Sequence, residues 1–93
     1  MSGKKIEWDE AKRARTLAER NLDFSDAEIV FAGDYVEMPD DRRDYGEERF
    51  IVYAALNDRP ICMVWTPRGD ARRIISMRHV HEQEFKARKG ALD

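Results

Sequence analysis

The chain has 93 residues, of which 42% are hydrophobic and 39% charged, and a formal net charge of −2 at pH 7. This composition excludes a disordered tail, and the length allows one domain with one modest core, because small domains bury only about 60% of their unfolded surface. No apolar run reaches the roughly 18 residues of a membrane span, and no signal-peptide segment follows the start. We therefore expect a single domain over residues 1–93, in the cytoplasm and without membrane contact.

A short strand and a helix are predicted at the start. Residues 5–8 can form the strand, and Asp9 offers an N-cap for a helix that ends near Asn21. The apolar residues that share one face of this helix are Ala11, Ala14, Leu17 and Ala18.

A capping box predicts a second, short helix. The pattern is Ser25-Asp26-Ala27-Glu28, with Phe24 and Ile29 placed as a hydrophobic staple and Gly33 as the stop. Residues 35–38 are predicted to form a strand that ends at Pro39, and the polar residues 40–46 are predicted to form a loop.

Three further strands follow at hairpin spacing, over residues 47–56, 60–66 and 72–79. The sheet should therefore be mainly antiparallel. A last helix over about 81–89, with Gly90 behind it, has Phe85 as its one strong apolar anchor. The expected fold is α+β in two layers, with the order β-α-α-β-β-β-β-α.

Alternation along these strands separates two faces of the sheet. The predicted core face holds Phe50, Val52, Met63, Trp65, Ile75 and Met77. The opposite face is mixed, and hence partly exposed, with Arg49, Ile51, Tyr53, Val64, Thr66, Ser76 and Arg78.

Charge is unevenly distributed along the chain. Residues 1–58 hold nine Lys and Arg against fifteen Asp and Glu, whereas residues 59–89 hold eight against three. Such an asymmetry suits one surface that faces phosphate and another that faces something else. Ordinary solvated charge explains it equally well from composition alone.

Three segments carry a resemblance to a known family: IEWDEAK at 6–12, DRRDYGEERF at 41–50 and TPRGDARRIISMR at 66–78. They are similar, in the expected order and over roughly residues 6–86, to the BrnT family, the toxin half of bacterial BrnT–BrnA toxin–antitoxin pairs. The resemblance implies a RelE-like ribonuclease fold. Members commonly show Lys-His-Gly where this chain has Glu19-Arg20-Asn21. If that histidine helps proton transfer in relatives, another group must do so in this chain, or its activity is weaker.

The resemblance implies metal-independent RNA cleavage. RNA supplies its own nucleophile, the 2′-hydroxyl group, so the protein needs a base, an acid and cations that receive charge at phosphorus. Arg49, Arg68 and Arg78 are the cations expected in this role, two on the mixed face and one at the neighbouring turn. Without the resemblance, we would interpret Arg49 and Arg78 as solvated charges or as cross-strand partners of acidic residues rather than as catalytic groups.

The histidines His79 and His81 are natural proton carriers near neutral pH. His79 is the expected catalytic one, and a strand-end histidine with no role is an equal alternative. His81 is expected at the start of a helix, with Glu82 and Glu84 as further candidates for the base.

RNA binding is expected to involve Tyr53, Arg72, Arg73 and His81, where Tyr53 can stack a base or simply pack. No metal or other cofactor is expected, because His-x-His and a distant cysteine lack a second ligand pair at usable spacing. The cysteine, Cys62, lies in an apolar run and reads as a small core residue of a protein in a reducing compartment.

The implied partners are RNA as substrate and a BrnA-like antitoxin that holds the toxin inactive, with promoter DNA bound only indirectly through the antitoxin. The alternative is a catalytically inactive relative that serves only as an antitoxin partner or adaptor. Direct DNA binding is a weaker reading, because no helix-turn-helix pattern with a basic recognition helix is present.

Overall fold

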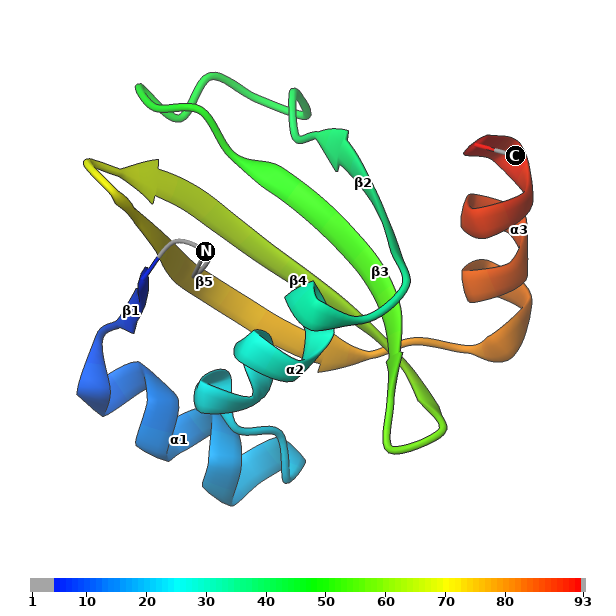
Figure 1. Cartoon of the computed structure of the whole chain (residues 1–93), viewed down its shortest axis with the longest axis horizontal. Helices are drawn as coiled ribbons and strands as arrows, with labels where there is room; N and C mark the ends of the chain where they lie inside the picture. Colours follow the sequence, from blue (N-terminus) through cyan, green and yellow to red (C-terminus); the bar gives the residue numbers. More distant parts are fainter. Residues whose placement is uncertain (1–4, 93) are drawn as a thin grey trace.

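A computed structural model describes the backbone of residues 5–92 and the side chains of residues 5–88. Five strands, three α-helices and a short 3-10 helix are formed in this part of the chain (Figure 1). In chain order they are β1 (Lys5–Trp8), α1 (Glu10–Arg20), η1 (Phe24–Asp26), α2 (Ala27–Ala32), β2 (Tyr35–Pro39), β3 (Phe50–Leu56), β4 (Arg59–Arg68), β5 (Ala71–His79) and α3 (Glu82–Leu92).

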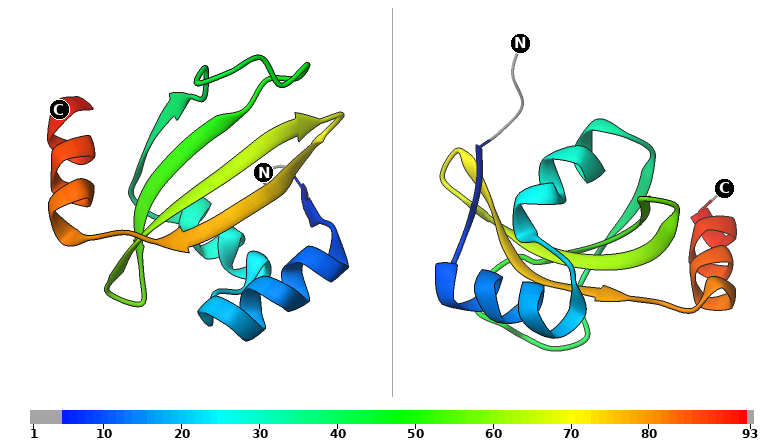
Figure 2. Two further views of the ribbon diagram at one scale, coloured as in Figure 1. Left: turned by 180° about the vertical axis from the view of Figure 1, so that it is seen from behind. Right: turned by 90° about the horizontal axis from the view of Figure 1, so that it is seen from below.

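The strands form one sheet in the order β1-β5-β4-β3-β2. Strands β2 to β5 are antiparallel to their neighbours, whereas β1 runs parallel to β5. Helix α1 runs beside β5, α2 contacts β3, and α3 stands apart from both helices, against β2, β3 and β4 (Figure 2). The predicted α+β fold and its order β-α-α-β-β-β-β-α are confirmed.

The two faces of the sheet carry two separate apolar clusters. The larger one lies between the sheet and the segment from Leu22 to Val30, and its fully buried members include Phe24, Val52, Ile61, Met63 and Met77. The smaller one lies on the opposite face, where Tyr53, Cys62 and Val80 are buried and Phe85 of α3 packs against them. Helix α3 is therefore attached to the sheet face that the sequence predicts to be mixed.

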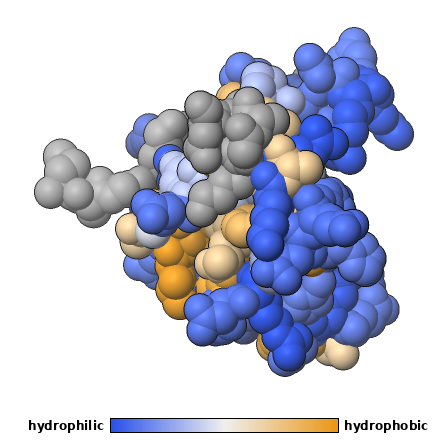
Figure 3. All heavy atoms as spheres, turned by 90° about the vertical axis from the view of Figure 1, so that its right-hand side faces the viewer, coloured by the Kyte–Doolittle hydropathy of each residue, from blue (hydrophilic) through white to orange (hydrophobic). Residues whose placement is uncertain are grey.

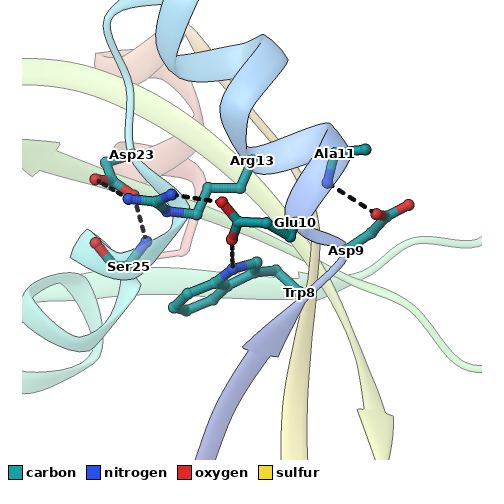
Figure 4. Close-up of polar contacts among 7 residues, drawn as sticks. All are labelled: Trp8, Asp9, Glu10, Ala11, Arg13, Asp23 and Ser25. Carbon is teal, nitrogen blue, oxygen red and sulfur yellow. Dashed lines mark hydrogen bonds and ion pairs between the residues drawn. The ribbon is translucent and has the colours of Figure 1, made fainter.

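Helix α1 is held by polar contacts rather than by buried side chains (Figure 4). None of its residues is buried, and the apolar face formed by Ala11, Ala14, Leu17 and Ala18 is exposed. The guanidinium of Arg13 donates to Asp23 at 2.8 and 3.1 Å and to Glu10 at 2.9 Å. At the other end, Arg20 donates to the carbonyl oxygen of Met77 at 2.6 Å.

The ends of α1 agree with the prediction. The Asp9 carboxylate accepts the N–H of Ala11 at 3.1 Å, as an N-cap does. Asn21 ends the helix with a φ of 58°, in the left-handed region that asparagine tolerates better than most residues other than glycine. An asparagine can therefore end the helix at this position.

The predicted capping box is wrong. Asp23, not Ser25, caps the turn: its carboxylate accepts the N–H of Ser25 at 3.0 Å, and this bond together with Arg13 lowers the pKa of Asp23 (Figure 4). Asp26 precedes α2 without a capping hydrogen bond from its side chain. Ile29, predicted as half of the staple, is 60% exposed.

A β-bulge changes the predicted core face. Val64 pairs with Ser76 and Trp65 pairs with Ile74, so Ile75 is the extra residue between them. Ile74 is consequently buried in the core, and Ile75, which alternation had placed there, is only partly buried.

Several predicted boundaries also move, and β4 continues to Arg68, which was expected in the turn, rather than ending at residue 66. Strand β3 begins at Phe50 rather than at residue 47, and α3 continues through Gly90, which was expected to lie behind the helix. No helix in the described part of the chain is long and apolar enough to cross a membrane.

Replacing Asp23 tests the contacts that hold α1 to the rest of the domain. Asp23→Ala should lower the free energy of unfolding by about 1–2 kcal/mol, because it removes an N-cap and the acceptor of Arg13. Asp26→Ala is the matched control and should change stability by less, since Asp26 makes no capping bond. Urea unfolding followed by circular dichroism measures both, and equal losses would contradict the assignment of Asp23 as the cap.

Candidate active site

Three polar side chains meet on the sheet face below α3. The carboxylate oxygen Oε2 of Glu84 accepts a hydrogen bond from the guanidinium of Arg78 and another from the hydroxyl group of Tyr53, both at 3.2 Å. Arg78 keeps 46% of its side-chain surface exposed, and Glu84 keeps 34%. A cation and a phenol thus both donate to one carboxylate, and the cation and the carboxylate are partly exposed to solvent.

Strand register brings these groups together. Tyr53 of β3 pairs with Cys62 of β4, and Cys62 pairs with Arg78 of β5, so the three side chains form one row across the sheet. Helix α3 adds Glu84 above this row, because Phe85 next to it packs on the same face. We refer to Tyr53, Cys62, Arg78 and Glu84 as the Arg78 cluster.

The protonation states in the cluster are set by these contacts. The hydrogen bond from Arg78 lowers the pKa of Glu84, so the carboxylate is charged at neutral pH. Burial raises the pKa of Tyr53, so its hydroxyl group keeps its proton. Burial opposes the charge of Arg78, yet its bond to Glu84 and its other neighbours raise its pKa overall. A proton acceptor and a proton donor therefore lie beside a permanent cation.

Cys62 lies in the floor of the cluster and is 5% exposed. Burial raises the pKa of its thiol, which therefore stays protonated at neutral pH. It is a free, buried cysteine, as the sequence predicts.

Arg49 and Arg68 form a second group, apart from the Arg78 cluster. Both lie near Glu47, with Arg49 at 2.9 Å and Arg68 at 3.9 Å, and Arg49 also lies over the ring of Tyr45, 4.2 Å from its centroid. Arg49 is four residues before Tyr53, which corresponds to roughly 13 Å along an extended chain. The three arginines predicted from the sequence thus stand at two separated places.

The two histidines lie in different places. The ring of His79 contacts the carbonyl oxygen of Arg20, at the end of α1, with 3.0 Å between Nε2 and O. Because neighbours in a strand point to opposite faces, His79 lies across the sheet from Arg78. His81 is exposed just before α3, and its carbonyl oxygen accepts the N–H of Phe85. His81 is therefore within one helical turn of Glu84, and His79 is not close to it.

Arg72 and Arg73 are not brought to the Arg78 cluster either. Arg72 points to the core face, where its guanidinium lies 3.9 Å from the ring centroid of Phe31 and 5.2 Å from that of Trp65. Arg73 pairs with Glu7 of β1 at 3.1 Å. Arg72 thus contacts aromatic residues of α2 and β4, and Arg73 contacts the neighbouring strand.

The sequence predicts Glu84 only as a further candidate for the base, and the structure brings it into contact with Arg78 and Tyr53. Its partner Tyr53 is 31 residues away in the chain, so no local pattern connects them. The one available signal was the position of Glu84 next to Phe85, the apolar anchor of the last helix. Among the described residues, no three His, Cys, Asp or Glu side chains gather in a way that could hold a metal ion.

Comparison with known families adds an independent finding. Residues 8–84 match the family model described as "Ribonuclease toxin, BrnT, of type II toxin-antitoxin system". The matched range includes every member of the Arg78 cluster. No curated protein matches the chain.

A carboxyl titration tests the geometry of the cluster. In the wild type, the pKa of Glu84 should lie below the ordinary value of about 4.3, and Arg78→Gln should raise it by removing the positive charge. Carbon-13 NMR of the side-chain carboxyl groups measures this shift. Arg73→Gln, which removes the partner of Glu7, is the control and should leave Glu84 unchanged. An identical Glu84 titration in wild type and Arg78→Gln would show that the two groups do not interact.

Proposed function

Since the chain belongs to the BrnT family of type II toxin–antitoxin ribonuclease toxins, we propose that it is an endoribonuclease that cleaves RNA through the 2′-hydroxyl group without a metal ion, and so arrests translation. The observation that carries the proposal is the contact of Glu84 with both Arg78 and Tyr53, in which Arg78 and Glu84 are partly exposed to solvent. These residue types supply the groups that such a cleavage needs.

The proposed reaction uses Arg78 and Glu84 directly. Glu84 accepts the proton of the 2′-hydroxyl group while the 2′ oxygen attacks the adjacent phosphorus, and the bond from phosphorus to the 5′ oxygen breaks. The products are a 2′,3′-cyclic phosphate and a 5′-hydroxyl end. Arg78 binds the phosphate oxygens as charge builds up on them, a role worth on the order of 3 kcal/mol for one well-placed donor.

Other groups have supporting roles in this proposal. Tyr53 donates to Glu84 and so orients the carboxylate for proton transfer. His81, exposed and one turn before Glu84, is the candidate donor to the leaving 5′ oxygen. Arg49 and Arg68 bind phosphates further along the strand. The position of His79 across the sheet favours Glu84 and His81 over it as proton carriers.

A type II toxin acts with an antitoxin, and we propose a BrnA-like protein as that partner, with promoter DNA contacted only through it. A catalytically inactive family member, which would bind the antitoxin alone, is the alternative that the experiment must exclude.

Expression without an antitoxin tests the activity. The wild type should arrest bacterial growth and fragment cellular RNA, while Arg78→Ala and Glu84→Gln should each relieve the arrest at matched protein levels. With purified protein, each change should slow cleavage by about 10²-fold or more. Arg59→Ala, an exposed arginine of the β3–β4 hairpin, is the control and should behave as wild type.

Product analysis tests the chemistry separately. A 2′-deoxy nucleotide at the cut site should block cleavage, and a metal chelator should leave the rate unchanged. Arg49→Ala and His79→Ala rank the remaining candidates: His79→Ala should retain most of the activity. Normal growth with intact RNA from a folded wild type would assign the chain to the inactive alternative.

A further inference from the structure

A hollow lies beside the Arg78 cluster, between α3 and the ends of β2 and β3. Its volume is about 420 Å³, within the range of roughly 300–1,000 Å³ that ligand sites occupy. The residues that matter for its chemistry are Asp34, Val36, Tyr53, Ala55 and Phe85. Seen from the side on which α3 lies, the molecule presents apolar surface framed by hydrophilic residues (Figure 3).

Tyr53 connects the hollow to the proposed reaction. Its hydroxyl group donates to Glu84, and the same residue forms part of the wall of the hollow. Phe85, another wall residue, follows Glu84 directly in α3. A nucleotide whose phosphate contacts Arg78 therefore has the hollow within reach of its own base.

The walls fit the two kinds of surface that a nucleobase presents. Val36 and Phe85, both half-buried, supply an apolar and an aromatic side chain for the flat faces of the base, the contact on which single-stranded RNA recognition commonly relies, while the buried Tyr53 forms the wall beside them. Asp34 is exposed at the hollow and supplies carboxylate oxygens, which accept hydrogen bonds from N–H groups at the edge of a base.

Among the bases, guanine matches a carboxylate best. Its Watson–Crick edge presents two neighbouring N–H donors, N1–H and the N2 amino group, which two carboxylate oxygens can accept together. Uracil presents one N–H on this edge, and cytosine and adenine present an amino group next to an acceptor nitrogen, which a charged carboxylate repels.

We propose that this hollow binds the base next to the scissile phosphate and that Asp34 makes the enzyme prefer guanine there. The proposal rests on the ribonuclease activity proposed above and adds its substrate specificity. It commits to a nucleobase as the occupant because the hollow and the Arg78 cluster share Tyr53.

The test uses short RNAs that differ only in the base beside a single cut site. The wild type should cleave the guanine RNA at least about tenfold faster than the other three, a ratio in keeping with one stacked and hydrogen-bonded base. Ala55→Phe, which adds a ring to the hollow, should reduce this ratio to near one. Asp34→Asn should also reduce the ratio, while cleavage of the other three RNAs continues. Matched controls are Ala14→Phe on the exposed side of α1 and Asp70→Asn in the β4–β5 turn.

Binding of uncleavable 2′-O-methyl versions of the same RNAs, followed by fluorescence anisotropy, gives a readout that does not depend on catalysis. The guanine version should bind best to the wild type and lose this advantage in Ala55→Phe. A wild type that cleaves all four RNAs equally, or an Ala55→Phe variant that keeps the wild-type preference in both assays, overturns the base site and leaves the nuclease standing. A wild type that neither cleaves nor binds RNA overturns both proposals.

Discussion

The burial of β4 on both of its faces is the constraint on which the rest of the structure depends. Every side chain from Ile61 to Thr66 is buried, and β4 pairs with β3 on one side and β5 on the other. A strand in this position needs a cover on each face. The segment from Leu22 to Val30 covers one, and α3 contributes to the other through Phe85. The helix that carries Glu84 is therefore in place because Tyr53 and Cys62 need an apolar neighbour, and the Arg78 cluster follows from this packing.

Local patterns predicted most of the fold but failed where a tertiary contact decided the outcome. Alternation placed Tyr53 and Arg78 on one face correctly, since both lie in regular strands. Alternation failed at Ile75, because the bulge in β5 depends on the pairing with β4. The sequence of β5 alone has no pattern that indicates the bulge. Alternation and periodicity also do not show how α1 is held: its apolar face stays exposed, and the helix is attached through Arg13 and Arg20. Asp23 was missed as a cap because a local Ser-x-x-Glu pattern stood beside it.

In the candidate site, too, local patterns predicted some features, and tertiary contacts decided the others. Arg78 could be chosen from its strand position, while its grouping with Glu84 and Tyr53 depended on how α3 docks, which composition and periodicity do not determine. The contacts of Arg72 could not be predicted either: the sequence places this arginine in a basic segment, and in the structure its guanidinium lies over Phe31 and Trp65 on the core face. In a chain with 39% charged residues, the contacts of each arginine depend on the tertiary structure and cannot be predicted from its residue type.

The parallel pairing of β1 with β5 has a consequence for folding order. Glu7 and Arg73, which meet across this pair, are separated by 66 residues, whereas β3, β4 and β5 are joined by tight hairpins. Closing the longer loop costs more chain entropy and yields contacts only after the hairpins exist, so the edge strand is expected to join last. During synthesis on the ribosome, β1 emerges first yet must wait for β5, the strand that carries Arg78. The sheet, and with it the row of side chains that holds Arg78, can thus be completed only when most of the chain has left the ribosome.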